Sequence, residues 1–207
     1  RHIALEFHGW QLVYNVETLR RLQSEVGGDL LGVNLDPSHL FWMGADPLEV
    51  AKALADCVYH VHIKDVRLEK AAGQNTLLDT KGVLEFASRS WNFVTPGSGH
   101  GADWWRTFLR TLRECGYDGA LSIEQEDYTI PLEEALKKAV ALLRQANPGL
   151  ALRAVTLTAK EKACLSKNEA GRPVCLPEAC PYARGYYVRQ KDALAFLLDG
   201  GGQLGRP

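Results

Sequence analysis

Four short apolar segments, each followed by acidic residues or histidines, constrain the fold of this chain more than any other feature. They are residues 3–8, 30–39, 57–65 and 120–127. An apolar run that changes abruptly to such residues is typical of a buried parallel strand whose C-terminal end opens into a site. Because the same pattern recurs four times, the sequence predicts one shared site at that end of a sheet.

The segments between these candidate strands have helical character. Strands are expected at residues 3–7, 30–36, 58–64 and 121–124, and helices at 15–26, 46–56, 102–115 and 131–145. This alternation indicates parallel βα units. A closed eight-stranded (β/α)₈ barrel takes about 250 residues and carries its active site at the C-terminal strand ends. Residues 1–149 supply four units, so the fold class expected is α/β, a partial TIM barrel. Residues 66–99 are expected to form a long irregular binding loop or lid.

Composition suggests a soluble protein made of two unlike pieces. The chain has 207 residues, 46% hydrophobic and 24% charged, and no apolar run approaches the roughly 20 residues that span a bilayer. With an odd number of cysteines and no visible signal peptide, a cytoplasmic protein with reduced thiols is expected. Residues 151–207 carry nine Lys/Arg against five Asp/Glu. We expect a Cys-containing appendage at 150–199 and a disordered tail at 200–207. The start at Arg1 is interpreted as a cut.

The residues at the strand ends suit a divalent cation. Two or three carboxylates with one imidazole are typical ligands of Mn²⁺, Mg²⁺, Co²⁺ or Zn²⁺. The candidate ligands are Glu6, Asp36, His62 and Glu124. Such a cation can grip two oxygens of a hydroxy-carbonyl sugar and stabilise an enediolate. With Glu6 and Glu124 on opposite sides of the carbon, one could abstract a proton and the other return it, which is epimerisation or aldose–ketose isomerisation.

Other polar residues are candidates for holding the substrate. His39 and Arg67 are suited to bind hydroxyls or a phosphate, and the turn at residues 97–100 could direct backbone N–H groups toward an anion. Simpler interpretations stand beside these. Asp36 before Pro37 could cap a turn, and Lys64 and Asp65 are expected to form a surface pair.

The first 145 residues also resemble a known family. The segments LEFHGWQLVYN, GVNLDPSHLFW, VYHVHIKD, RSWNFVTPGSGH and LSIEQEDY are similar to the C-terminal half of sugar phosphate isomerases/epimerases of the xylose isomerase-like TIM-barrel superfamily. The resemblance implies that strands five to eight give Glu6, Asp36, His62 and Glu124 to a metal, with the two glutamates as the acid–base pair.

The same resemblance implies how the substrate, a small sugar or sugar phosphate, is bound. It places substrate contacts at His39 and Arg67, and His100, in the turn at residues 97–100, is a further candidate contact from the sequence itself. Strands one to four of that barrel are absent from this sequence. Four units alone would leave two exposed sheet edges. The resemblance therefore implies a missing N-terminal half or a homo-oligomer.

Three cysteines in the appendage raise a separate hypothesis. Cys164, Cys175 and Cys180 are spaced C-x10-C-x4-C and could bind an iron–sulfur cluster or zinc with a fourth ligand, or could be free thiols. Residues 154–198 resemble the iron–sulfur segment of DinG/XPD-like DNA helicases, which implies a [4Fe–4S] cluster and a nucleic-acid partner. That family uses four cysteines, and neither a phosphate loop nor a motor motif is present here.

An endonuclease IV-like abasic-site nuclease is a further enzyme hypothesis, because that fold shares a rim of carboxylates and histidines. It would need more metal ligands and a basic surface for DNA. The net charge of −5 over the residues that precede the appendage speaks against it.

Overall fold

The computed structural model describes residues 2–27, 30–79 and 81–147. The chain divides into two compact units, Arg1–Leu152 and Arg153–Pro207. The second unit, with Cys164, Cys175 and Cys180 and the expected tail, lies outside the described residues.

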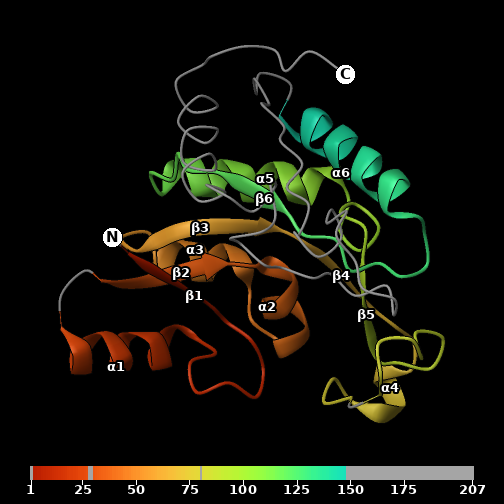
Figure 1. Cartoon of the computed structure of the whole chain (residues 1–207), viewed down its shortest axis with the longest axis horizontal. Helices are drawn as coiled ribbons and strands as arrows, with labels where there is room; N and C mark the ends of the chain where they lie inside the picture. The colour runs from red at the N-terminus through yellow and green to blue at the C-terminus, as the bar shows by residue number, and fades with distance from the viewer. Residues whose placement is uncertain (1, 28–29, 80, 148–207) are drawn as a thin grey trace, which may run out of the picture. The chain divides into compact units, whose positions relative to one another are not determined.

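A parallel sheet of four strands organises the first unit (Figure 1). Its strands stand in the order β1-β2-β3-β6. The bounds are β1 (Ile3–Glu6), β2 (Leu31–Leu35), β3 (Val58–Ile63) and β6 (Leu121–Ile123). Each consecutive pair is parallel, which confirms the α/β class and the four expected strands. That these strands are half of a closed barrel stays a prediction.

Helices follow the strands, and the first three of them begin at capping side chains. They are α1 (Val16–Val26), α2 (Pro37–Met43), α3 (Pro47–Ala53), α5 (Ala102–Glu114) and α6 (Leu132–Ala146). Asn15 forms a capping box at α1, and Asp46 caps α3 ahead of its first-turn proline. Helix α2 was not expected, because a strand was predicted at residues 30–36 and Asp36 was considered only as a metal ligand or as the cap of a turn. Among the described residues, no helix is long and apolar enough to span a membrane.

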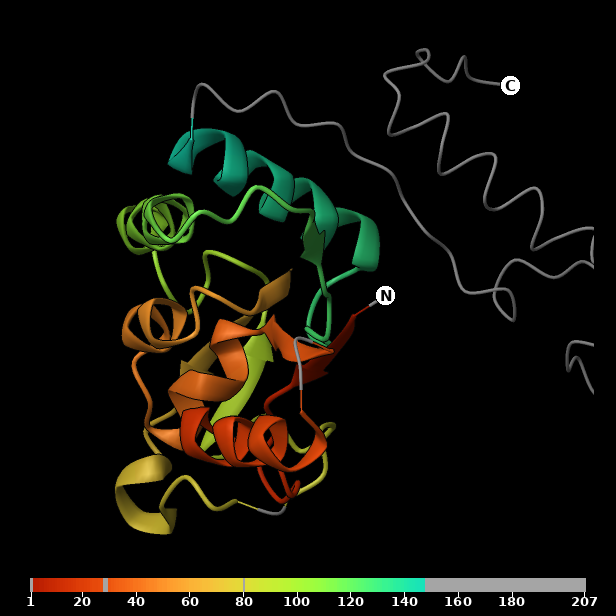
Figure 2. The ribbon, with the colours of Figure 1, turned by 90° about the vertical axis from the view of Figure 1, so that its left-hand side faces the viewer.

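The expected irregular connection after β3 contains regular structure, and that expectation was wrong. Strands β4 (Asp65–Leu68) and β5 (Trp91–Val94) pair antiparallel, and a short helix, α4 (Ala72–Asn75), lies between them in the chain. The two strands are far apart in sequence, so no tight-turn signal announced their pairing. Since only Lys64 separates β3 from β4, this hairpin extends from the C-terminal end of the sheet, as Figures 1 and 2 show.

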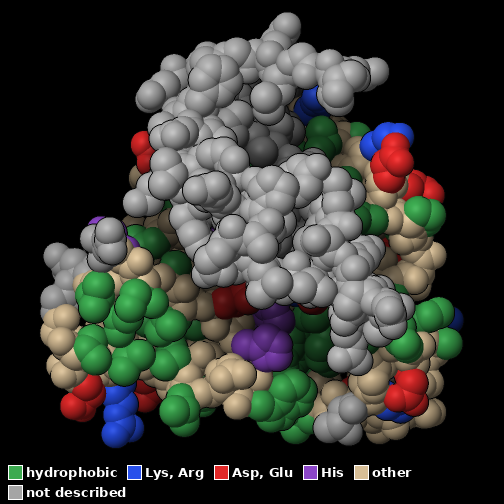
Figure 3. Space-filling model, in the orientation of Figure 1, with side chains coloured by type: hydrophobic (Ala, Val, Ile, Leu, Met, Phe, Trp, Pro, Cys, Tyr) green, Lys and Arg blue, Asp and Glu red, His purple; other side chains and the backbone are tan. Residues whose placement is uncertain are grey.

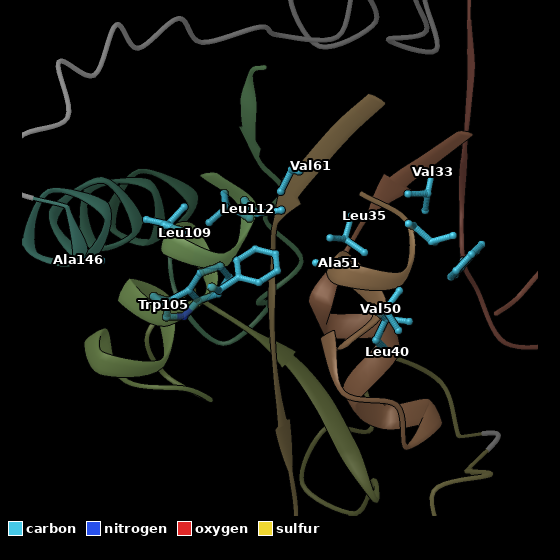
Figure 4. Close-up of a cluster of buried hydrophobic side chains, with 14 of the residues drawn as sticks. Val33, Leu35, Leu40, Val50, Ala51, Val61, Trp105, Leu109, Leu112 and Ala146 are labelled. Atoms are coloured by element: carbon cyan, nitrogen blue, oxygen red, sulfur yellow. The ribbon is translucent and has the colours of Figure 1, made fainter. Parts of the chain in front are cut away.

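A hydrophobic core packs the helices onto the sheet (Figure 4). Val61 of β3 faces Trp105 and Leu112 of α5, whereas Leu35 of β2 faces α2 and α3. Trp105 and Phe108 are fully buried. Truncating either side chain to alanine would lower the free energy of unfolding by about 3–5 kcal/mol. The core therefore fixes the strands whose ends carry the polar residues.

Replacing Gly32 should test the close approach of β2 and β3. A Cβ at Gly32 would lie 2.3 Å from the carbonyl oxygen of Cys57 and 2.4 Å from the ring of Tyr59. Because such overpacking costs about 1–3 kcal/mol, Gly32→Ala should lower Tm by several degrees in a thermal melt. Gly73→Ala is the control, since nothing lies within 4 Å of a Cβ there. Equal melting temperatures for both variants would contradict this account.

Candidate metal centre

The four candidate ligands all lie at the C-terminal ends of the parallel strands. Glu6 ends β1, Asp36 and Glu124 directly follow β2 and β6, and His62 lies near the end of β3. The register pairs Glu6 with Asn34 and His62 with Ser122. Since residues two apart in a strand share a face, these four side chains project from the same face of the sheet.

One atom from each of the four residues converges on a small space. The ligand atoms of Glu6, Asp36, His62 and Glu124 lie within 4.8 Å of one another. His62 Nδ1 lies 2.8 Å from Glu6 Oε1, 3.1 Å from Glu124 Oε2 and 3.7 Å from Asp36 Oδ2. Figure 3 shows acidic and histidine side chains side by side on the surface. The sequence prediction that these groups meet is confirmed in its geometry, whereas their metal-binding role stays a prediction.

The two carboxylate oxygens of Asp36 differ in their hydrogen bonding. Its Oδ1 accepts hydrogen bonds from the backbone N–H of Ser38 at 2.8 Å and from its hydroxyl at 2.7 Å, which caps α2. Its Oδ2 is buried and has no hydrogen-bond partner in the part of the chain that the structure describes. A buried carboxylate oxygen without a partner is unfavourable unless a cation compensates it. Three carboxylates and one imidazole fit a mainly oxygen-ligated divalent ion.

The protein's own charges partly balance the cluster. Burial lowers the pKa of His62, but contacts with the three carboxylates outweigh burial and raise that pKa to about 11. The hydrogen bond to His62 lowers the pKa of Glu124 to about 2. Burial raises the pKa of Asp36, which is almost fully enclosed and stands too far from His62 for a strong hydrogen bond. Glu124 therefore holds its negative charge beside the His62 imidazolium, whereas burial favours the neutral carboxyl form of Asp36.

Lys64 supplies a second positive charge. Its ammonium lies 3.2 Å from Glu124 Oε2 and 2.7 Å from Glu126 Oε2, and 4.1 Å from the ring centroid of Phe93. Its side chain is buried, so the expectation of a surface pair at residues 64–65 was wrong. Burial lowers the pKa of Lys64, but the charge of Asp36 and the contact with Glu126 outweigh it and raise that pKa. Lys64 and His62 thus contact the same carboxylate oxygen of Glu124.

His39 lies next to the cluster and is neutral. Burial, helped by the charge of Lys64, lowers the pKa of His39 to about 3. Its Nδ1 accepts a hydrogen bond from Trp42 Nε1 at 3.3 Å, so Nε2 carries the proton. That nitrogen lies 3.9 Å from Asp36 Oδ2. His39 therefore presents a donor at the edge of the cluster, where the sequence expected a substrate contact.

The turn at residues 97–100 holds an internal anion. Asp65 Oδ2 accepts hydrogen bonds from the backbone N–H groups of Gly97 at 2.9 Å, Gly99 at 3.0 Å and His100 at 2.9 Å. A Cβ at Gly99 would lie 2.1 Å from the Val66 carbonyl oxygen. The expectation that this turn directs N–H groups at a ligand needs correction, because the Asp65 carboxylate already occupies them.

Two expected substrate contacts lie outside the four-residue cluster. His100 Nδ1 lies 2.7 Å from Asp65 Oδ1, and its ring stacks on Phe41 at 3.8 Å between centroids. Arg67 lies on β4, where its guanidinium pairs with Glu69 at 2.7 Å. Their substrate-binding roles remain predictions. The described cysteines, Cys57 and Cys115, are free thiols.

Sequence reasoning missed three residues of the site. Asn34 donates from Nδ2 toward Glu6 Oε1 at 3.5 Å, and Lys64 and Glu126 form the ion pair beside Glu124. Each stands two residues from a predicted ligand along an extended chain. The period of two in a strand, which places alternate residues on one face, was the signal that could have identified them.

Residues 2–146 match the family described as xylose isomerase-like TIM barrel, and the chain belongs to this family. Its relatives include the uncharacterized protein YfiH of Bacillus subtilis, 47% identical over 144 residues that cover 69% of this chain and 46% of YfiH. An inosose dehydratase of Clostridium perfringens is 32% identical over 140 residues, covering 65% of this chain and 45% of the relative. The chain thus spans about half the length of the curated relatives it matches.

Solved structures agree on the fold. A xylose isomerase domain protein from Planctomyces limnophilus has a TM-score of 0.52 at 26% identity, over 73% of this chain and 48% of that one. The IolI protein, solved with a zinc atom, has a TM-score of 0.52 at 23% identity, over 73% of this chain and 51% of IolI, and shows the fold alone. The helicase-type resemblance of residues 154–198 finds no support among these relatives.

Removing the charge of Asp65 should loosen the turn that it holds. Asp65→Asn replaces charge-assisted hydrogen bonds, each worth about 1.5–3 kcal/mol, with weaker ones. Amide hydrogen exchange at Gly97, Gly99 and His100 should accelerate at least about tenfold. Asp118→Asn, at an exposed position, is the control and should leave these rates unchanged. Unaltered protection in Asp65→Asn would show that other contacts hold the turn.

Proposed function

We propose that this chain carries the catalytic half of a divalent-metal-dependent enzyme that isomerises or epimerises a small sugar or sugar phosphate. The observation that carries this proposal is the convergence of Glu6, Asp36, His62 and Glu124 within 4.8 Å of one another. These residues would hold the ion. When bound, it supplies positive charge that stabilises negative charge on the substrate's oxygens during proton removal from carbon.

The two glutamates would act as acid and base. Glu6 and Glu124 arrive from β1 and β6, the outer strands of the sheet, so they approach the site from opposite sides. One carboxylate takes the proton from the carbon next to the carbonyl, and the other returns a proton to the resulting enediolate. Return to the opposite face of the same carbon gives an epimer, and return to the neighbouring carbon gives the aldose–ketose isomer.

Neighbouring residues would orient this chemistry. Lys64 bonds to both Glu124 and Glu126, and so fixes the direction in which the Glu124 carboxylate points. His39, a neutral donor beside Asp36, would hold a substrate hydroxyl. Both residues are buried, so the surrounding side chains limit their movement.

Dehydration is the second candidate reaction. The inosose dehydratase of Clostridium perfringens is 32% identical over 140 residues. Elimination of water also begins with proton removal beside a carbonyl, and the second carboxylic acid would then protonate the departing hydroxyl instead of a carbon. The same residues therefore serve either reaction, and the position of the leaving hydroxyl on the substrate decides between them.

Catalysis would require further strands around the sheet. Among the described residues, β1 and β6 each pair with a parallel strand on one side only. Open parallel edges are unfavourable, and four strands leave one side of the site without walls. We propose that the active form completes this enclosure with further βα units, from the same polypeptide or from a second copy.

Metal titration tests the site directly. Mn²⁺ is the suitable probe, because thiolates elsewhere in the chain bind it poorly. It should bind stoichiometrically, and Asp36→Asn and Glu124→Gln should each weaken binding at least about 100-fold in isothermal titration calorimetry. Asparagine is also a good helix cap, so Asp36→Asn removes the ligand charge while keeping the α2 cap. Glu133→Gln, exposed on α6, should bind Mn²⁺ as the unchanged chain does. Full affinity in both site variants would remove the proposed ligand set.

Proton exchange tests the reaction. With Mn²⁺ in D₂O, the protein in its enclosed form should exchange the carbon-bound hydrogen beside the carbonyl in one member of a panel of ketoses, ketose phosphates and inososes. Mass spectrometry separates deuterium gain, which indicates epimerisation or isomerisation, from loss of water, which indicates dehydration. Glu6→Gln and Glu124→Gln should each lower the rate by about 100-fold or more. Exchange that survives both changes would refute the acid–base pair.

A further inference from the structure

A small pocket lies beside the metal centre. Its volume is about 170 Å³, and its walls include Arg67, Arg89 and Phe93. Glu126, from the segment after β6, forms another part of the lining. We name it the hairpin pocket, because β4, β5 and the chain between them provide most of its surface. Typical sites for whole small molecules exceed about 300 Å³, so this pocket has room for one functional group.

One cation that lines the hairpin pocket has no anionic partner among the described residues. Arg67 pairs with Glu69 at 2.7 Å, and Glu126 pairs with Lys64 at 2.7 Å. Arg89 is only 5% exposed, and among the residues that the structure describes no ion pair reaches it. Its Nε is buried without a hydrogen-bond partner. Arg89 is therefore the cation of the lining that, among the described residues, no carboxylate contacts.

The surroundings of Arg89 do not offset its burial. Its guanidinium lies 4.5 Å from the centroid of the Trp91 ring. The stabilisation from such a cation–π contact is smaller than the cost of burying a charge that has no partner. An anion in the pocket would offset that cost. Arginine binds phosphate and carboxylate through paired N–H groups, which makes these the groups that match the site best.

The hairpin pocket shares a wall with the metal centre. Phe93 and Glu126 line the pocket, and both contact the ammonium of Lys64, which also bonds to Glu124. The ring of Phe93 also lies 5.1 Å from that of His39. A ligand whose oxygens lie at the metal centre can therefore extend past Lys64 into the pocket.

We propose that the hairpin pocket is an anion site in which Arg89 binds the phosphate or carboxylate of the substrate. That Arg89 binds an anion is independent of the proposed function. That this anion belongs to the substrate rests on the proposed function. The site gives the enzyme a preference for acidic or phosphorylated sugars over neutral ones.

Phosphate binding to the metal-free full chain tests the anion site. Inorganic phosphate should bind saturably in calorimetry or by NMR titration, and Arg89→Gln should weaken binding at least about tenfold. Arg110→Gln, which changes an exposed arginine on α5, is the matched control and should bind phosphate normally. Absence of saturable binding to the unchanged chain, or full affinity in Arg89→Gln, would overturn the proposal.

Because Arg89 is buried, a variant at that position could misfold, so a substitution at the exposed edge of the pocket provides a second test. Ala87 is exposed and lines the pocket, so Ala87→Glu places a carboxylate there without disturbing the core. Ala87→Glu should abolish phosphate binding at an unchanged Tm, whereas Ala87→Gln, of similar size and without charge, should retain most of it. Equal phosphate affinities for these two variants would count against an anion site.

Two further measurements distinguish failure of the anion site from failure of the proposed metal centre. Asp36→Asn should lose Mn²⁺ and keep phosphate, whereas Arg89→Gln should lose phosphate and keep Mn²⁺. Competition against bound phosphate by acetate and by methyl phosphate then names the preferred anion. A stronger effect of either compound supports the site with that specificity, and failure of both to compete refutes it.

Discussion

Charge compensation at the ends of the parallel strands is the constraint on which the rest of this structure depends. Three carboxylates meet there, and two like charges about 4 Å apart repel by roughly 4 kcal/mol near a protein surface. His62 sits among all three and Lys64 beside Glu124, so two positive charges hold the group together. The parallel register makes the convergence unavoidable, because it brings the ends of β1, β2, β3 and β6 to one edge.

The sequence predicted the parallel sheet well and the hairpin poorly, for a physical reason. Apolar runs and capped amphipathic helices are local signals, and they identified all four parallel strands and the helices α1, α3, α5 and α6. Strands β4 and β5 pair across more than twenty residues, and each is only four residues long. Such pairing is stabilised by tertiary contacts and leaves little local pattern. Helix α2 was hidden because Asp36 both caps it and looks like the end of a strand.

The parts of the site that could be predicted are the residues whose type and place after an apolar run mark the end of a strand. Glu6, Asp36, His62 and Glu124 were identified because each follows an apolar run. The burial of Lys64 was not anticipated, because a lysine at a strand end is usually solvated. Only the structure reveals that the Lys64 ammonium pairs with Glu126 and lies over the ring of Phe93. In the same way, the three N–H groups of the turn at residues 97–100 looked available for a ligand until the position of Asp65 was known.

The Asp65 carboxylate ties the turn after β5 to the start of β4, and Asp127 does the same from the β6 side by accepting hydrogen bonds from Thr95. The base of the hairpin, where β4 begins and β5 ends, is thereby fixed before any molecule arrives. Ordering a mobile side chain on association costs about 0.5–1.5 kcal/mol, and a preorganised wall avoids that entropic loss for each group it immobilises. A ligand reaching this edge would meet a rigid surface, so its affinity would depend on the match of its shape and charge and little on loop closure.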